Sequence, residues 1–332
     1  PKVREEAFPQ LWDKQPSALL KLLLESECLP VHQFAVKALQ KNSQYCDRLN
    51  ISYLIQLLNS TYEITAEFAF TLARSKYDPQ LPDRELVLAV ANCIVASARE
   101  QAYQWIEAQR EYFFSSSDFI ANLVTSDRQN TRAFARRLLS SSILGESTAQ
   151  LLIARIITTL LDLNETKTEM AQEVSETLLL SFTLGLRTLG FPIILDLLDH
   201  PLSEIQVLGA RILLNHRTPA NELPPDLIES LLSSPHDSVR SVGIRIFGQL
   251  PDERLIRDRI LIIAMAVNSS SDIRHAIHPV IERLAVNHPE FGRQMAIDLI
   301  DLLTEPERHQ GVHKDLVTLL KNKIPNWMPY VP

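Results

Sequence analysis

Two pairs of histidines have the spacing with which one helix face can present two imidazoles to a metal ion. His309 and His313 lie four residues apart, and His275 and His278 lie three apart. A zinc-binding helix of the peptidase type also carries a glutamate directly after its first histidine, which both pairs lack. Pro279 follows the second pair and would disturb a helix there. We therefore expect these histidines to be solvated or hydrogen-bonded locally, with no metal bound.

Other patterns that would indicate catalysis are missing from the sequence. Cys28, Cys46 and Cys93 are far apart and form no Cys-x-x-Cys pair, so they predict neither a zinc site nor a disulfide framework. Unpaired cysteines favour a reducing compartment, and we expect a cytoplasmic protein. The glycine-rich phosphate loops and the Gly-x-Ser-x-Gly nucleophile turn do not occur. We expect no catalytic residues, no cofactor and no enzyme activity.

The composition narrows the class of protein further. The chain has 332 residues, 45% of them hydrophobic, with 19 prolines, 8 glycines and a formal net charge of −7. The acidic balance argues against a surface that binds polyanions throughout, although a local basic patch is compatible with it. No apolar run reaches the roughly 18 residues that span a bilayer, so we expect no membrane association. The first residue is proline, which suggests a fragment of a longer protein.

A helical pattern recurs along the chain. In the segment that begins at Val239, apolar residues occupy positions 1, 4, 5 and 8, which share one face of a helix. The same template fits segments that begin at Val31, Thr65, Ala98, Thr131, Ile205 and Ile273, and the start-to-start distances are 34, 33, 33, 74, 34 and 34 residues. The distance of 74 is slightly more than two periods, so we expect one degenerate, slightly longer repeat within it. An internal period of this length predicts a repeat protein.

Position 5 of the template is small in six of its seven copies. The residues at this position are Ala35, Ala69, Ala102, Ala135, Gly209 and Gly243, with Ile277 as the exception. A small residue at a fixed place on the buried face indicates that two helix backbones approach closely there. Apolar segments at 19–26, 53–60, 119–126, 193–200 and 227–234 each end five residues before position 1. We take them as first (A) helices that pair with second (B) helices carrying the template.

The start of the B helices resembles that of HEAT repeats. Asp237-Ser238-Val239-Arg240 matches the Asp-x-Val-Arg start of that family. Asp272-Ile273-Arg274 is similar but one residue shorter, and Arg99 and Arg132 also occupy position 2. Tetratricopeptide repeats share the period, but their Trp-Leu-Gly…Tyr pattern is missing. The resemblance implies an all-α, right-handed superhelical solenoid of about nine helix pairs. It also implies that Arg99, Arg132, Asp237, Arg240, Asp272 and Arg274 are structural, the arginines bonding neighbouring repeats, and Asp237 is placed to cap its helix.

We expect one solenoid over residues 1–332. Clear repeats cover about 17–142 and 190–287, a degenerate repeat covers 143–189, and a capping region covers 288–332. Terminal repeats are commonly atypical because one face must contact water.

Position 7 of the B helices points away from the predicted core. Its residues are Lys37, Thr71, Gln104, Arg137, Arg211, Arg245 and Pro279, of which four are basic and none is acidic. Arg136 adjoins the row at position 6. In HEAT solenoids the B helices line the concave surface, so the resemblance implies a binding groove here. We predict a scaffold that holds another protein, or an acidic or phosphorylated peptide, along Lys37, Arg136, Arg137, Arg211 and Arg245.

Two other HEAT-like classes remain as alternatives. Alkylpurine DNA glycosylases hold DNA on a basic face with aromatic residues, for which Trp105 is the candidate. Phycobilin lyases use similar solenoids, but no residue here suggests a bilin site. Tyr112, Phe113 and Phe114 are expected to pack between repeats. The tail from Trp327 to Tyr330 is expected either to fold back as a cap or to begin a linker.

Overall fold

The fold is all-α, as the sequence predicts. The computed structural model describes residues 7–323, which contain helices and turns and no strand. The A helices are α2 (Pro16–Glu25), α5 (Ile51–Leu58), α7 (Arg84–Asn92), α10 (Ser117–Val124), α12 (Glu146–Leu161), α15 (Phe191–Leu198), α17 (Pro225–Leu232), α20 (Arg259–Ala266) and α22 (Pro289–Thr304). The B helices are α3 (Leu29–Leu39), α6 (Glu63–Lys76), α8 (Ala96–Ala108), α11 (Gln129–Ser140), α13 (Thr168–Ser181), α16 (Ser203–Leu214), α18 (Asp237–Phe247), α21 (Ser271–Asn287) and α23 (Val312–Lys323).

Short helices connect some of these pairs. They are α1 (Pro9–Asp13), α4 (Ser43–Asp47), α9 (Arg110–Phe114), α14 (Thr183–Leu186) and α19 (Asp252–Arg257), with 3₁₀ turns at Glu165–Lys167 and Ala220–Glu222. No helix within residues 7–323 is long and apolar enough to cross a membrane.

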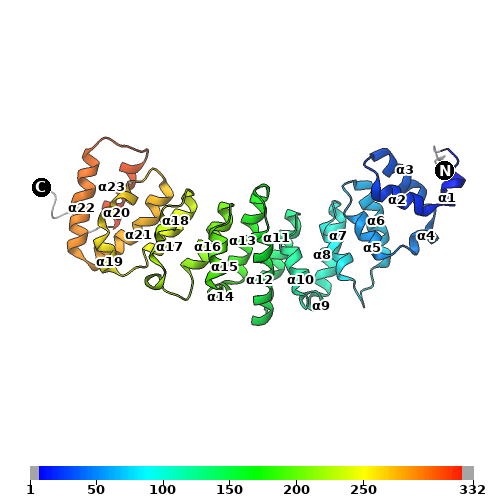
Figure 1. The fold of residues 1–332 in the computed structure, drawn as a ribbon, viewed down its shortest axis with the longest axis horizontal. Helices are drawn as coiled ribbons and strands as arrows, with labels where there is room; N and C mark the ends of the chain where they lie inside the picture. The colour runs from blue at the N-terminus through cyan, green and yellow to red at the C-terminus, as the bar shows by residue number, and fades with distance from the viewer. Residues whose placement is uncertain (1–6, 324–332) are drawn as a thin grey trace. The chain divides into compact units, whose positions relative to one another are not determined.

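The chain divides into two compact units, 1–159 (unit 1) and 160–332 (unit 2). The division falls inside α12, within the stretch that the sequence marks as a degenerate repeat. In unit 1 the packed pairs are α2/α3, α5/α6, α7/α8 and α10/α11, and in unit 2 they are α15/α16, α17/α18, α20/α21 and α22/α23. Within each unit the pairs follow one another in chain order (Figure 1). The helix-pair solenoid is therefore present on both sides of the division.

The predicted register holds, with small shifts at the helix ends. Each templated B helix begins two residues before position 1, and the A helices end one or two residues before the predicted segments do. The expected cap at Asp237 was wrong. The N-cap of α18 is His236, without a side-chain cap bond, and Asp237 is the first helical residue. Its carboxylate forms an ion pair with Arg240.

Position 5 marks the close approach of A and B helices, as predicted. The four alanines at this position are at most 1% exposed. A Cβ atom added to Gly243 would lie 2.9 Å from Cβ of Leu231 and 3.0 Å from its backbone carbon. At Gly209 an added Cβ would lie 3.1 Å from Cβ of Leu197. Leu197 and Leu231 belong to the A helices of the same repeats, so the small residue sets the spacing within each pair.

The B helices of unit 2 stack on one another. Helix α13 packs on α16, α16 on α18, α18 on α21, and α21 on α23. In unit 1, α3 packs on α6. Tyr103 of α8 stacks on Phe134 of α11 with ring centroids 4.2 Å apart, and its hydroxyl lies 2.9 Å from Oγ1 of Thr131. Stacking of this kind brings equivalent positions of successive B helices side by side.

Candidate binding surface on the B helices

A repeated hydrogen-bond arrangement, which we call the turn clamp, fixes the start of the B helices. It has two bonds. The side chain at position 2 donates to the backbone carbonyl of the residue six positions earlier, at the end of the A segment. The side chain of that earlier residue accepts a hydrogen bond from the backbone N–H two residues after it. Both bonds satisfy polar groups that a helix-to-helix turn would otherwise leave without a partner.

The first bond of the clamp occurs in six of the seven templated repeats. His32, Arg99, Arg132, Gln206 and Arg274 donate to Ser26, Cys93, Ser126, His200 and Asn268 respectively, each at 2.8 Å, and Arg240 donates to Ser234. The second bond is made by the side chains of Ser26, Ser60, Ser126, His200, Ser234 and Asn268. His32 and Gln206, which depart from arginine in the sequence pattern, therefore perform the same task.

These contacts revise the expected role of the position-2 arginines. Their clamp bonds run within a repeat, whereas a ladder between repeats was expected. Arg274 also reaches the next repeat, through Asp315 of α23. The acidic residues differ as well: Asp237 bonds Arg240 of its own helix, while Asp272 is exposed and makes no hydrogen bond or ion pair within residues 7–323. The side chain of Asp272 therefore makes no hydrogen bond to a neighbouring repeat within residues 7–323.

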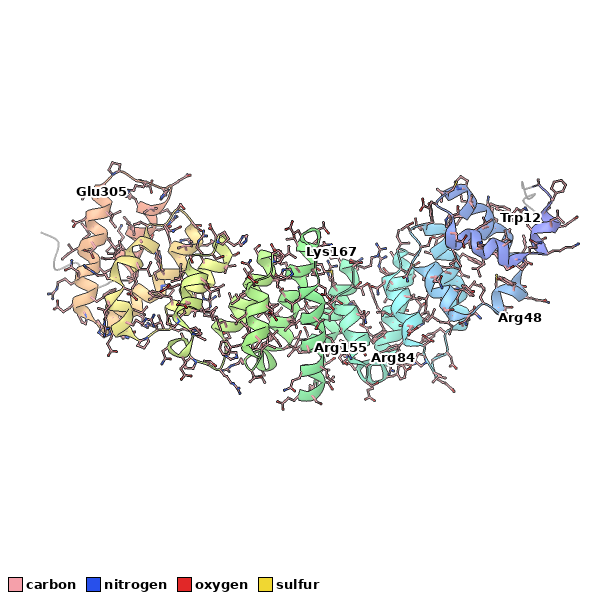
Figure 2. All side chains as sticks on the ribbon, viewed as in Figure 1. Trp12, Arg48, Arg84, Arg155, Lys167 and Glu305 are labelled. Carbon is pink, nitrogen blue, oxygen red and sulfur yellow. The ribbon has the colours of Figure 1, made fainter. Side chains whose placement is uncertain are left out.

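Contacts between successive repeats of unit 1 come from residues that the sequence does not single out. Arg84, at the start of α7, donates to the backbone carbonyl of Tyr112 at 2.8 Å and lies over its ring. Arg110 donates to the carbonyl of Leu138 at 2.6 Å and to Ser142 at 2.8 Å. Both arginines thus satisfy carbonyls at the C-terminal end of a following helix. Figure 2 labels Arg84 and also Arg155, whose guanidinium pairs with Asp118 of α10.

The row at position 7 faces solvent in both units. All seven of its residues are exposed, in contrast to the buried position 5 of the same helices. Within residues 7–323, Lys37, Arg211 and Arg245 form no ion pair and no side-chain hydrogen bond. Helices that pack directly on one another lie about 8–10 Å apart. Arg211 and Arg245, on adjacent helices α16 and α18, are therefore close enough to contact one extended chain.

The two arginines of α11 are more constrained. Arg137 is exposed, and its guanidinium carbon lies 5.9 Å from the centroid of the Phe134 ring. Arg136 is half-buried and already interacts within the protein. Of the predicted basic residues, Lys37, Arg211 and Arg245 therefore make the fewest side-chain contacts with polar or aromatic groups of the protein.

The aromatic residues are used for packing. Trp105 is 9% exposed and stacks on Tyr77 with ring centroids 4.0 Å apart. It is therefore not presented to a nucleic-acid base, which removes the aromatic residue that favoured a glycosylase and leaves only the basic row. Phe113 is buried, and its ring centroid lies 4.7 Å from that of Phe119. The hydroxyl of Tyr112 donates to the backbone carbonyl of Pro82 at 2.8 Å. Tyr112 and Phe113 thus pack between elements, as predicted. The Trp327–Tyr330 tail lies outside the described residues.

The two histidine pairs lie in different surroundings in unit 2. His275 and His278 have ring centroids 5.7 Å apart, and His275 contacts Asp315. His309 and His313 line a cavity of about 140 Å³ with Leu302, Val312 and Leu316. No cluster of three or more histidine, cysteine, aspartate or glutamate side chains suited to a metal occurs in residues 7–323.

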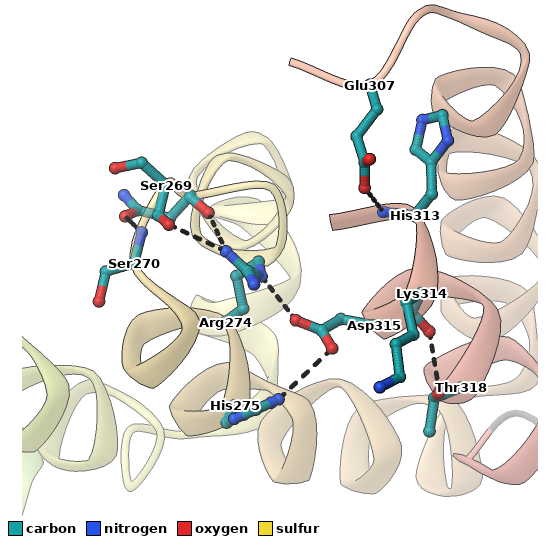
Figure 3. Close-up of polar contacts among 10 residues, drawn as sticks. Ser269, Ser270, Arg274, His275, Glu307, His313, Lys314, Asp315 and Thr318 are labelled. Atoms are coloured by element: carbon teal, nitrogen blue, oxygen red, sulfur yellow. Dashed lines mark hydrogen bonds and ion pairs between the residues drawn. The ribbon is translucent and has the colours of Figure 1, made fainter. Parts of the chain in front are cut away.

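An ion pair ties α23 to α21 in unit 2 (Figure 3). Nε of Arg274 donates to Oδ2 of Asp315 at 2.7 Å, and Nε2 of His275 lies 3.5 Å from Oδ1. The Arg274 side chain is 4% exposed and that of Asp315 is 16% exposed. Partial burial acts to raise the pKa of Asp315, but the hydrogen bond and charge of Arg274, helped by His275, outweigh it and hold that pKa below its ordinary value.

Asp315→Asn is expected to weaken this tie by about 2 kcal/mol at neutral pH, because a charge-assisted hydrogen bond to a buried arginine is lost. The folded pKa of Asp315 lies below the unfolded one, near ~4. The stabilisation is therefore full above that pH and is lost as the pH falls through the folded pKa. Hydrogen exchange of the α23 amides should show faster opening in the variant at pH 7, with the difference closing in acid. Asp301→Asn, at an exposed carboxylate on α22, is the control, and equal exchange in the two variants would contradict the assignment.

No family model matches the chain, and no curated protein matches it. Among solved structures, importin beta is similar at 11% identity, with 94% of this chain covered and a TM-score of 0.49. The chain spans 48% of that importin beta chain. An engineered protein is similar at 18% identity over 82% of this chain and 96% of the engineered one, with a TM-score of 0.26.

Proposed function

We propose that this chain is a non-enzymatic scaffold that binds an acidic segment of a partner protein along the position-7 residues of the B helices of unit 2. One observation carries the proposal. Helices α16, α18 and α21 of unit 2 expose position 7, and the cations Arg211 and Arg245 at this position have no intramolecular partner in residues 7–323. Arg99, Arg132, Arg240 and Arg274, by contrast, are occupied in the turn clamps.

The electrostatics support an acidic partner. The chain as a whole has a net negative charge. Two exposed arginines without an ion-pair partner at the same position of adjacent helices therefore differ from the average charge of the surface. An arginine that has no intramolecular carboxylate can offer its full set of donors to a carboxylate or phosphate of a partner. Binding through exposed charges of this kind is weakened by salt, because counterions screen it.

Photo-crosslinking tests where a partner sits. Short random peptides would be selected by display against the protein, and a photo-reactive residue would replace Pro279, the exposed position-7 residue of α21 in unit 2. Tyr53 of α5 and Ile260 of α20, which are 42% and 81% exposed on A helices, give the control positions. We expect selected peptides enriched in aspartate and glutamate that crosslink at Pro279. Equal crosslinking at Tyr53 and Ile260, or DNA binding at low salt that the peptides do not compete, would overturn the proposal.

A further inference from the structure

A cavity of about 250 Å³ lies between three B helices of unit 2 and includes one member of the position-7 row. Along α13 it is lined by Gln172, Ser175, Glu176 and Leu179, and along α16 by Glu204, Val207, Leu208 and Arg211. Both sets follow the spacing of a single helix face, so two facing stripes form the walls. Pockets that enclose a whole small molecule measure roughly 300–1,000 Å³. This cavity is smaller and suits part of a longer chain.

The polar groups of the cavity that have no partner within residues 7–323 include Oγ of Ser175 and the side chains of Arg211 and Glu204. Oγ of Ser175 makes no hydrogen bond, although the residue is only 5% exposed. A buried hydroxyl without a partner is unfavourable, and a ligand that bonds it would remove that cost. Arg211 and Glu204 form no ion pair with each other or with another side chain. They lie seven residues apart on α16, which is about 10 Å along the helix axis.

Two polar side chains of the α13 wall bond each other. Nε2 of Gln172 donates to Oε1 of Glu176 at 3.2 Å. Val207 lies between Glu204 and Arg211 on the same helix face, with Leu208 beside it, so the wall of α16 is acidic, then apolar, then basic. A fully acidic guest would meet the charge of Glu204, and a fully basic guest would meet that of Arg211.

We propose that this cavity reads a mixed-charge motif in the bound segment. The motif is an extended stretch in which a basic residue faces Glu204, an apolar residue packs on Val207 and an acidic residue pairs with Arg211. Alternate residues of an extended chain face the same side and repeat every ~6.6 Å, so three alternate side chains cover the length of this wall. The inference rests on the proposed function and adds the sequence requirement at one place along the row.

Two synthetic peptides test this motif. One carries lysine, leucine and glutamate at alternate positions separated by glycines, and the other carries glutamate, leucine and glutamate. Their dissociation constants would be measured by fluorescence polarisation with the wild type, Glu204→Lys and Val207→Trp. Val286→Trp, at a valine that is 64% exposed on α21, is the control for the added ring. Circular dichroism would confirm that each variant is folded.

The wild type is expected to prefer the lysine-containing peptide about tenfold, and Glu204→Lys is expected to invert that preference. Val207→Trp should weaken binding of the lysine peptide at least tenfold, while Val286→Trp should leave it unchanged. A wild type that does not distinguish the peptides, or that binds neither, would overturn the inference, as would a Val207→Trp variant that binds normally.

Arg245→Glu separates this inference from the proposed function, because Arg245 belongs to the row but not to the cavity lining. If Arg245→Glu leaves binding unchanged while the cavity variants weaken it, the proposed binding along the position-7 residues is contradicted and the proposed role of the cavity is supported. If Arg245→Glu weakens binding while the cavity variants have no effect, the cavity is overturned and the row stands.

Discussion

Gly243→Val is expected to destabilise unit 2 by about 3 kcal/mol or more. Even a Cβ atom would lie 2.9 Å from Cβ of Leu231 and 3.0 Å from its backbone carbon, and valine adds two further methyl groups. Leu231 is 3% exposed on α17, so the side chain has no room to turn away. Overpacking of a well-packed core commonly costs about 1–3 kcal/mol, and contact with backbone places this site at or above that range.

Urea unfolding of Gly243→Val measures this cost. Valine gains a few tenths of a kcal/mol over glycine in helix propensity, which is too little to offset the clash. Arg245→Val, at the exposed position 7 of the same helix, is the control and should change stability by about 0.5 kcal/mol or less. A Gly243→Val protein as stable as this control would show that the A–B spacing of α17 and α18 is not set by the residue at position 5.

The repeat register could be read from the sequence because it depends on local periodicity. The small residues at position 5 and the exposed residues at position 7 occur at fixed places on each helix, so a template fitted to one repeat locates them in the others. Only part of the turn clamp could be predicted from the sequence. Arginine was recognised at position 2, but His32 and Gln206 fill the same role with different side chains, since any donor of adequate reach satisfies the carbonyl.

Contacts between repeats were harder to predict. Arg84 and Arg110 bond carbonyls 28 residues further along the chain, and no local pattern marks them. The cavity at Ser175 also escaped prediction, because α13 lies in the degenerate region where the template does not apply. A lone serine in an acidic helix gives no signal until the facing stripe of α16 is in place.

Arg211→Glu combined with Arg245→Glu is expected to weaken binding of the display-selected acidic peptides about fiftyfold. Each exposed charge pair is worth up to about 1 kcal/mol, and reversal replaces that attraction with repulsion of similar size. Two sites therefore sum to at most about 4 kcal/mol, and fiftyfold corresponds to about 2.3 kcal/mol, since each 1.4 kcal/mol is tenfold in affinity. The guanidinium groups make no intramolecular ion pair in residues 7–323, so fold stability should be unaffected.

Arg254→Glu combined with Arg257→Glu is the matched control. Both arginines are exposed on α19, in the same unit, and the double change alters the net charge of the chain by the same amount. A difference between the two double variants therefore reports the position of the charges and is independent of their sum.

The dissociation constants of these two double variants for one selected peptide, measured side by side at low and high salt, test the position-7 row most directly. The binding surface proposed here predicts about fiftyfold weaker binding for Arg211→Glu/Arg245→Glu at low salt, a smaller difference at high salt, and near-wild-type affinity for Arg254→Glu/Arg257→Glu. Equal affinities for the two variants would contradict it.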